Sequence, residues 1–244
     1  MFVNGLKTKI IIAMLCALIL SVAPSALAAP VTVTLDASMS AWYEQRFSTY
    51  TGPSRNQNYV VGFTPGSFGD KTYRNLFVFD LSGVSESAAS AELHLTRGSG
   101  GGLDPFATYT LYQVTASAAE VMDGGTNAEK EVIWNDLGSG VVYGSAQISN
   151  SSGATELVTV DLNAEALADI NAADGLFVMG GALSPVSTNG GMRFGHTHPG
   201  STPLGSFVPI RQLTMTVPEP STLMLAAIGF LSLFAFAGRR YRVS

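Results

Sequence analysis

The sequence predicts an all-β body, an antiparallel β-sandwich, followed by one C-terminal transmembrane helix. Three observations lead to this fold class. Segments rich in Val, Thr, Tyr and Phe recur between clusters of Gly, Asn, Ser and Pro. Only 13% of residues are charged, about half of the ~25% found in typical soluble domains. An uncharged apolar run close to the C-terminus is followed at once by arginines.

The strand segments are short and several alternate between apolar and polar residues. In one of them Ala91, Leu93 and Leu95 share a face, and Glu92 and His94 share the other. Turn residues between such segments are typical of a sandwich. The expected strands are 31–35, 58–63, 73–81, 90–97, 108–114, 141–148, 156–162, 175–181 and 211–217.

One helix is expected within the body, over residues 163–173. Asn163 can cap its N-terminus, and Leu167 and Ile170 lie on one face at a spacing of three.

The body is acidic and lacks thiols. Residues 29–217 contain 17 Asp and Glu against 8 Lys and Arg, a net charge of −9. Such a surface does not attract polyanions, so nucleic acid is not an expected partner. The only cysteine, Cys16, precedes the body, which excludes disulfides, zinc–thiolate sites and a cysteine nucleophile there.

The N-terminus predicts a secretory signal peptide over residues 1–28. Lys7 and Lys9 precede a short apolar run, 10–20, and a small-residue ending follows. The run is too short to span ~30 Å of hydrocarbon comfortably. We expect cleavage between Ala28 and Ala29, with signal peptidase and the secretion machinery as partners.

The C-terminus predicts a membrane anchor. Residues 222–237 carry no charge and would form a helix of about 24 Å, a little short for ~30 Å of hydrocarbon but able to span it with local thinning and flanking anchors. Arg239, Arg240 and Arg242 in the basic tail 238–244 would keep the tail in the cytoplasm and the body outside. The lipid bilayer is therefore a partner. A buried core helix is the weaker alternative.

Pro218, Glu219 and Pro220 precede this helix. Prolines fix their own φ and lack an N–H, so the tripeptide should be extended and exposed. Motif, apolar run and basic tail together resemble the PEP-CTERM sorting signal, over residues 217–244. The resemblance implies an exosortase-type membrane enzyme as partner, cleavage near the motif, and release or transfer of the body to the surface. A rigid spacer is the plain alternative.

The body, 29–216, carries a second and more diffuse resemblance. The stretch 73–95, with an arginine, an apolar strand, Phe-Asp-Leu and Ser-Ala-x-Leu-x-Leu, resembles jelly-roll modules of the DNRLRE type. The strand, helical turn and returning strand of 158–183 fit the same scheme, and 132–140 approximates its tryptophan segment. The resemblance implies a jelly-roll-like fold related to carbohydrate-binding modules.

Candidate chemistry in the body is sparse. No Gly-x-Ser-x-Gly elbow is present, and Ser is too abundant to single out a nucleophile. Paired carboxylates could hydrolyse glycosides only if they faced each other. We expect surface charges instead, and no metal or cofactor. The residues weighed are His94, His196 and His198, carboxylates Glu44, Asp70, Glu92 and Asp136, and calcium candidates Asp104, Asp123 and Asp136.

Two further patterns have a structural and a functional interpretation. Arg74 and Asp80 share a strand face, which favours an ion pair or a turn cap over catalysis. Early aromatic residues could stack on sugar rings if exposed, although burial in the core is the better prediction. These aromatics are Trp42, Tyr43, Phe47, Tyr50 and Tyr59.

The leading hypothesis is a secreted, membrane-tethered, non-enzymatic surface or extracellular-matrix protein, processed by an exosortase and set among exopolysaccharide and biofilm. The alternative is a carbohydrate-binding module with extracellular polysaccharide as partner, which requires exposed aromatics on one sheet face. A secreted hydrolase is a third option and requires catalytic groups that converge in a cleft.

Overall fold

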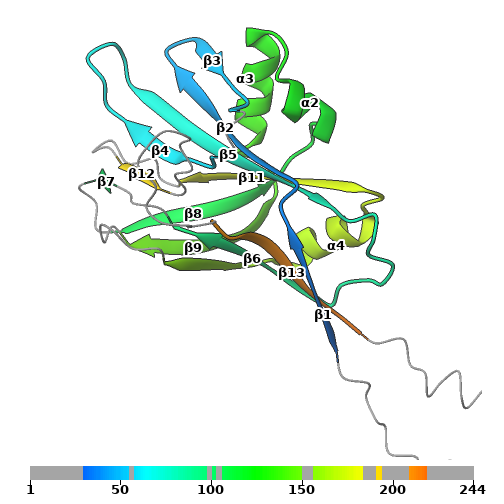
Figure 1. The fold of residues 1–244 in the computed structure, drawn as a ribbon. Coiled ribbons are helices and arrows are strands. Elements are labelled where there is room, and N and C mark those ends of the chain that lie inside the picture. Colours follow the sequence, from blue (N-terminus) through cyan, green and yellow to red (C-terminus); the bar gives the residue numbers. More distant parts are fainter. Residues whose placement is uncertain are drawn as a thin grey trace, which may run out of the picture. The chain divides into compact units, whose positions relative to one another are not determined.

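The structure is a computed structural model, and it describes residues 30–54, 58–97, 101–102, 106–149, 156–183, 191–193 and 209–218. Residues Val31–Val217 form one unit. Within this unit antiparallel strands build two sheets that form a sandwich-like body (Figure 1). The predicted fold class is therefore confirmed for the body.

The smaller sheet joins the two ends of the body. Its four strands lie in the order β1 (Val31–Asp36), β13 (Arg211–Val217), β6 (Ser90–Thr96) and β10 (Leu157–Asp161). Val31 lies opposite Val217, so the first and last strands pair along their whole length. In β6 the predicted alternation is confirmed, because Ala91, Leu93 and Leu95 are buried.

The larger sheet branches at β5 (Lys71–Asp80). One edge of β5 pairs with β2 (Met39–Arg46) over residues 71–78, and the other edge pairs first with β4 and then with β11. The path of this sheet is β7 (Gly101–Gly102), β12 (Gly191–Arg193), β4 (Val61–Thr64), β5, β11 (Leu176–Leu183), β8 (Phe106–Gln113) and β9 (Val142–Ser149), with β3 (Thr49–Thr51) beyond β2.

Two apolar cores lie on the two faces of β5. Phe77 and Phe79 point into the core between the sheets. Leu76 and Val78 point to the opposite face and pack under helices. This double coverage explains why β5 has an unbroken run of buried residues instead of alternation.

The second core is covered by two short helices, α2 (Ala118–Asp123) and α3 (Asn127–Asp136) (Figure 1). Each begins with a capping box, in which a hydroxyl and a glutamate three residues later satisfy the first backbone N–H groups. The pairs are Ser117 with Glu120 and Thr126 with Glu129. The expectation of a single helix in the body was wrong, and the tryptophan segment 132–140 begins inside α3.

The predicted helix is confirmed as α4 (Ala164–Ala172), where Asn163 accepts the N–H of Ala166 at 3.1 Å. Each segment predicted as a strand also contains one. The strands that the sequence did not predict are β2 and the short β3, β7 and β12. In β2 the polar residues Glu44, Gln45 and Arg46 follow one another, so this stretch has no alternating strand signal.

Candidate functional site

The sorting sequence begins where the last strand ends. Val217 is 3% exposed and is paired with Val31 at the start of β1. Pro218 is the next residue, and its missing N–H prevents continuation of the ladder. The last strand of the body therefore ends immediately before the first residue of the predicted motif.

The other predicted sorting and processing residues lie outside the described residues, as does the helix predicted at 222–237. In the part of the chain that the structure describes, no helix is sufficiently long and apolar to cross a membrane. The transmembrane helix therefore stays a prediction. The residues concerned are Ala28, Ala29, Glu219, Pro220, Arg239, Arg240 and Arg242.

An ion pair with a buried carboxylate and a partly exposed lysine meets two aromatic rings on neighbouring strands β2 and β5. Glu44 is 8% exposed, and its carboxylate lies 3.0 Å from Nζ of Lys71. The hydroxyl of Tyr73 also hydrogen-bonds Glu44. The ring of Trp42 meets that of Tyr73 edge to face, with centroids 5.3 Å apart. We call these four residues the Glu44 cluster.

The Glu44 cluster turns toward the smaller sheet. Tyr73 and Asn75 are two positions apart on β5 and therefore lie on the same face of the sheet. The side chain of Asn75 bonds Tyr109 at 2.8 Å in the core between the sheets. Burial and the neighbouring Glu44 raise the pKa of Tyr73, so its phenol stays a hydrogen-bond donor. Because Lys71 neutralises Glu44, this carboxylate is suited to binding hydroxyl groups more than to acting as a base.

Two exposed phenylalanines extend the aromatic surface beside this cluster. Phe47 is 75% exposed and Phe68 81%. The ring of Phe47 lies where a side chain at Gly69 would be, so only glycine fits there. The Arg46 guanidinium donates from Nε to the carbonyl of Phe68 at 2.8 Å. The Phe47 ring is therefore packed against Gly69, and the backbone of Phe68 is held by Arg46, while both rings stay exposed.

The remaining early tyrosines are structural. Tyr43 donates to the carbonyl of Val121 at 2.8 Å, which ties β2 to α2. Tyr59 donates to the carbonyl of Thr96 at 2.7 Å. Tyr50 is 8% exposed. Burial is thus confirmed for these three aromatics, whereas Phe47 is exposed and Trp42 is half-buried.

The candidate catalytic residues do not converge within the described residues. His94 lies on the smaller sheet, with Nδ1 3.1 Å from Oγ1 of Thr159 and Nε2 3.4 Å from Glu92. Asp136 accepts the N–H groups of Thr115 and Ala116 at 2.7 and 3.0 Å.

Asp70 lies elsewhere, 3.4 Å from the N–H of Gly66 in an exposed turn. Among the residues described, no three His, Cys, Asp or Glu are grouped to hold a metal. Asp104, His196 and His198 lie outside this part of the chain.

Arg74 and Asp80 do not act together. Asp80 accepts the N–H of Ser82 at 3.0 Å, which confirms the turn cap, and hydrogen bonds from Ser82 lower the pKa of Asp80. Arg74 instead lies 3.6 Å over the ring of Trp134 and donates to the carbonyls of Trp134 and Asn135. The expected ion pair is replaced by a strand-to-helix contact.

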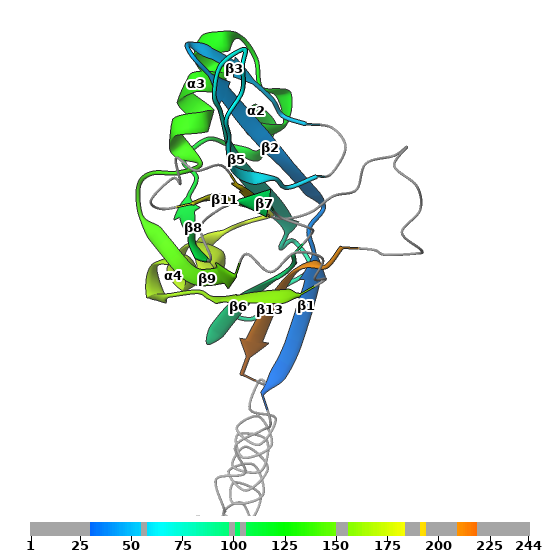
Figure 2. The same ribbon diagram turned by 90° about the vertical axis from the view of Figure 1, so that its left-hand side faces the viewer.

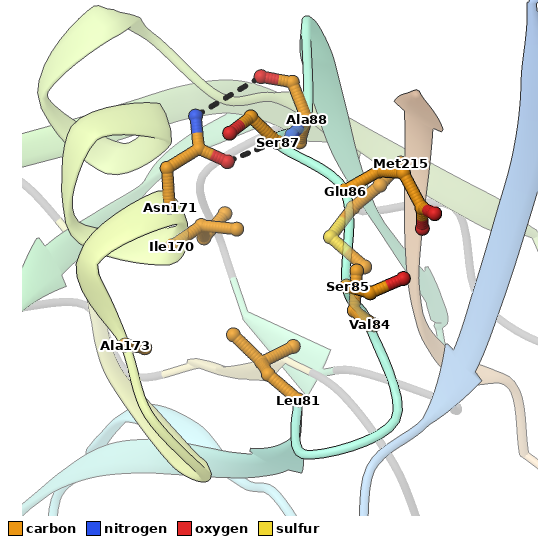
Figure 3. A pocket seen from close by; sticks show the side chains of 10 residues that line it. All are labelled: Leu81, Val84, Ser85, Glu86, Ser87, Ala88, Ile170, Asn171, Ala173 and Met215. Atoms are coloured by element: carbon orange, nitrogen blue, oxygen red, sulfur yellow. Dashed lines mark hydrogen bonds between the residues drawn. The ribbon is translucent and has the colours of Figure 1, made fainter. Parts of the chain in front are cut away.

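A small pocket of about 80 Å³ opens between α4 and the loop from β5 to β6 (Figure 3). Leu81, Ile170 and Met215 line its apolar part. The Asn171 side chain accepts the N–H of Ala88 at 2.7 Å and donates to the Ala88 carbonyl at 3.1 Å. Ligand pockets usually measure ~300–1,000 Å³, so this one is too small for a sugar or an organic cofactor.

Sequence reasoning missed Lys71, Tyr73 and Phe68 as members of the candidate site. Their signal was weak, because Lys71 and Tyr73 are 27 and 29 positions from Glu44 and meet it only through the β2–β5 register. The aromatic count near residue 42 was the sole usable hint.

The fold and its C-terminal junction define the protein as a β-sandwich body that carries a separate sequence directly after its last strand. Residues 216–240 match the family described as the PEP-CTERM protein-sorting motif. The match includes Pro218, Glu219, Pro220, Arg239 and Arg240. No curated protein matches the chain. The motif implies exosortase-dependent sorting to the surface, with an exosortase as processing partner.

Proposed function

We propose that this chain is an exported, non-enzymatic surface or matrix protein, tethered by its C-terminal helix until an exosortase removes the sorting sequence. The observation that carries the proposal is the position of the motif. The match begins at residue 216, inside β13, and continues past Pro218 without a linker. A finished domain joined directly to a removable sequence is suited to delivery of the domain itself.

The environment of the acidic residues supports a non-enzymatic body. Asp80 and Asp136 hold turns, and Glu120 and Glu129 cap helices. Glu44 is paired with Lys71. These carboxylates hold turns, cap helices or pair with a lysine, so they are engaged in the fold, whereas glycoside hydrolysis needs two carboxylates placed for catalysis.

The test is the intact mass and location of the mature chain. Replacement of Pro218, Glu219 and Pro220 by alanine should leave the chain at higher mass in the membrane fraction, while the unaltered chain is processed. The matched control replaces 202–204, a triplet that also contains a proline, and should be processed normally. Identical mass and location for the motif variant and the unaltered chain would contradict the proposal.

The second candidate, carbohydrate binding, is favoured by the Glu44 cluster and by Phe47 and Phe68. Aromatic faces and hydrogen-bonding groups together suit sugar rings. We expect retention on extracellular polysaccharide to fall at least ~10-fold in Trp42→Ala and Phe68→Ala, a loss of about 1.4 kcal/mol.

Phe106→Ala is the control for sugar binding, since Phe106 is 60% exposed on another strand, β8. Equal retention of Phe68→Ala and Phe106→Ala would count against a sugar site near the cluster.

A further inference from the structure

The outer edge of β1 is open. In the described residues β1 pairs only with β13, and Figure 2 shows β1 along the margin of the smaller sheet. The N–H of Ala37 donates to the carbonyl of Arg211 at 2.8 Å. Ala37 and Arg211 lie in the same register as Val31 and Val217, an even number of residues along the ladder. Odd-numbered residues therefore exchange hydrogen bonds with β13, and the backbone groups of Thr32 and Thr34 point outward.

The middle of this edge lacks the features that usually protect edge strands, which are found only at its two ends, Pro30 and Asp36. Residues 31–35 read Val-Thr-Val-Thr-Leu, with no charge and no proline, and the register with β13 has no bulge. Val31 is 42% exposed, and Val33 and Leu35 are only partly buried. The edge therefore offers both free hydrogen-bonding groups and uncovered apolar side chains.

The opposite edge of the same sheet is not open in this way. β10 lies against β9, where Gly144 approaches the carbonyl of Asp161 so closely that a side chain at Gly144 would collide with it. The smaller sheet can therefore be extended at β1 and not at β10.

We propose that the outer edge of β1 pairs, antiparallel, with the same edge of a second copy of this chain. With Val33 opposite Val33 of the other copy, Val31 meets Leu35 and Thr32 meets Thr34. Apolar residues thus face apolar residues and threonines face threonines, which stabilises cross-strand pairs. The outward groups of Thr32 and Thr34 satisfy one another, and two four-stranded sheets become one continuous sheet.

A second copy fits this edge better than another partner because the strand is complementary to itself. The body carries −9 overall, yet in this register Asp36 meets Pro30 of the other copy and not a second carboxylate. The predicted cleavage after Ala28 also leaves one residue, Ala29, ahead of Pro30. That is too short a segment to fold back and cover the edge.

The test uses single cysteines, since the only native cysteine lies in the predicted signal peptide. Val33 would face its own counterpart in a non-hydrogen-bonded pair with Cα atoms ~4.5 Å apart, which is disulfide geometry. Val33→Cys should therefore form a cross-linked dimer under mild oxidant. Leu35→Cys is the register control, because its counterpart lies about four residues away along the strands, ~13 Å, and should not cross-link.

A backbone variant checks the same edge without cysteine. Thr34→Pro removes an outward N–H and no backbone bond to β13, and it loses only the exposed contact of the Thr34 and Thr214 hydroxyls at 3.4 Å. The body should therefore fold with an unchanged far-ultraviolet spectrum while dimer formation is lost. Cross-linking of Val33→Cys no stronger than that of Leu35→Cys would overturn the proposal, as would cross-linking to a different protein.

The full chain in detergent tests the edge alone, since no membrane constrains it there. A dimer in detergent with no processing in cells would overturn the proposed sorting but not the pairing. Processing in cells without a dimer in detergent would overturn the pairing but not the proposed sorting.

Discussion

Arg74 joins the larger sheet to α3, and its replacement tests whether this contact stabilises the body. The guanidinium lies 3.6 Å over the ring of Trp134 and donates from Nη1 to the carbonyls of Trp134 and Asn135, at 2.7 and 3.0 Å. These carbonyls belong to the last turn of α3, where a cation also complements the helix dipole. Burial lowers the pKa of Arg74 to about 10, so it stays charged at pH 7.

The magnitude follows from three contributions. The cation–π contact contributes about 0.5–2 kcal/mol, each hydrogen bond about 1 kcal/mol, and the dipole about 0.3–1 kcal/mol. Removal of the charge also relieves its desolvation, and water reaches the end of the helix. We therefore expect Arg74→Met to lower the free energy of unfolding by about 2 kcal/mol. In a body of this size the Tm should fall by roughly 4–8 °C.

The assay is thermal and urea unfolding of the mature chain, followed by circular dichroism. Arg74→Lys keeps the charge but not the planar group, so its stability should lie between those of the unaltered chain and Arg74→Met. Arg46→Met is the comparison, since Arg46 is only partly buried at the end of β2 and its guanidinium bonds a single carbonyl, that of Phe68; its loss should be smaller, about 1 kcal/mol. Equal losses for Arg46→Met and Arg74→Met would refute the reasoning.

Two further predictions concern packing and pH. At Gly180 an added Cβ would lie 2.6 Å from Cα of Leu137, the residue that caps the end of α3, so Gly180→Ala should destabilise by about 1–3 kcal/mol in urea unfolding. Gly83→Ala, which meets nothing within 4 Å, should not. Burial raises the pKa of Tyr43, Tyr59 and Tyr109 in the folded body. In the unfolded chain these tyrosines ionise near pH ~10, so the free energy of unfolding is retained below that pH and falls as the pH rises above it. A free energy of unfolding that stays constant from pH 8 to 11 would contradict this.

The strands and α4 could be predicted because their patterns are local. Ala91, Leu93 and Leu95 alternate with polar residues, and Asn163 precedes an apolar spacing of three. Helix α3 gave no comparable stripe, since its buried residues, Ile133 and Trp134, are adjacent in sequence. The signal that could have revealed it is the capping box of Thr126 with Glu129, and the same holds for Ser117 with Glu120 in α2.

The two candidate sites differ in whether their residues are close together in the sequence. The sorting motif is a linear sequence, so Pro218 to Pro220 and the arginines could be named from it. The Glu44 cluster depends on which residues the β2–β5 register brings together, with Glu44 opposite Tyr73. Composition alone could not show that Glu44 is buried while Asp70 lies in an exposed turn, because burial results from packing between distant segments.

The pairing of the first and last strands bears on how release can occur without loss of the fold. β13 lies between β1 and β6, so its residues are hydrogen-bonded on both sides, and Met215 and Val217 are buried in the core between the sheets. Extraction of any of these residues by a processing enzyme would break a central strand. A cut after Pro218 breaks none, because that residue follows the ladder. The proposed cleavage is therefore compatible with an intact sandwich only beyond Val217, where a released body would keep every described strand.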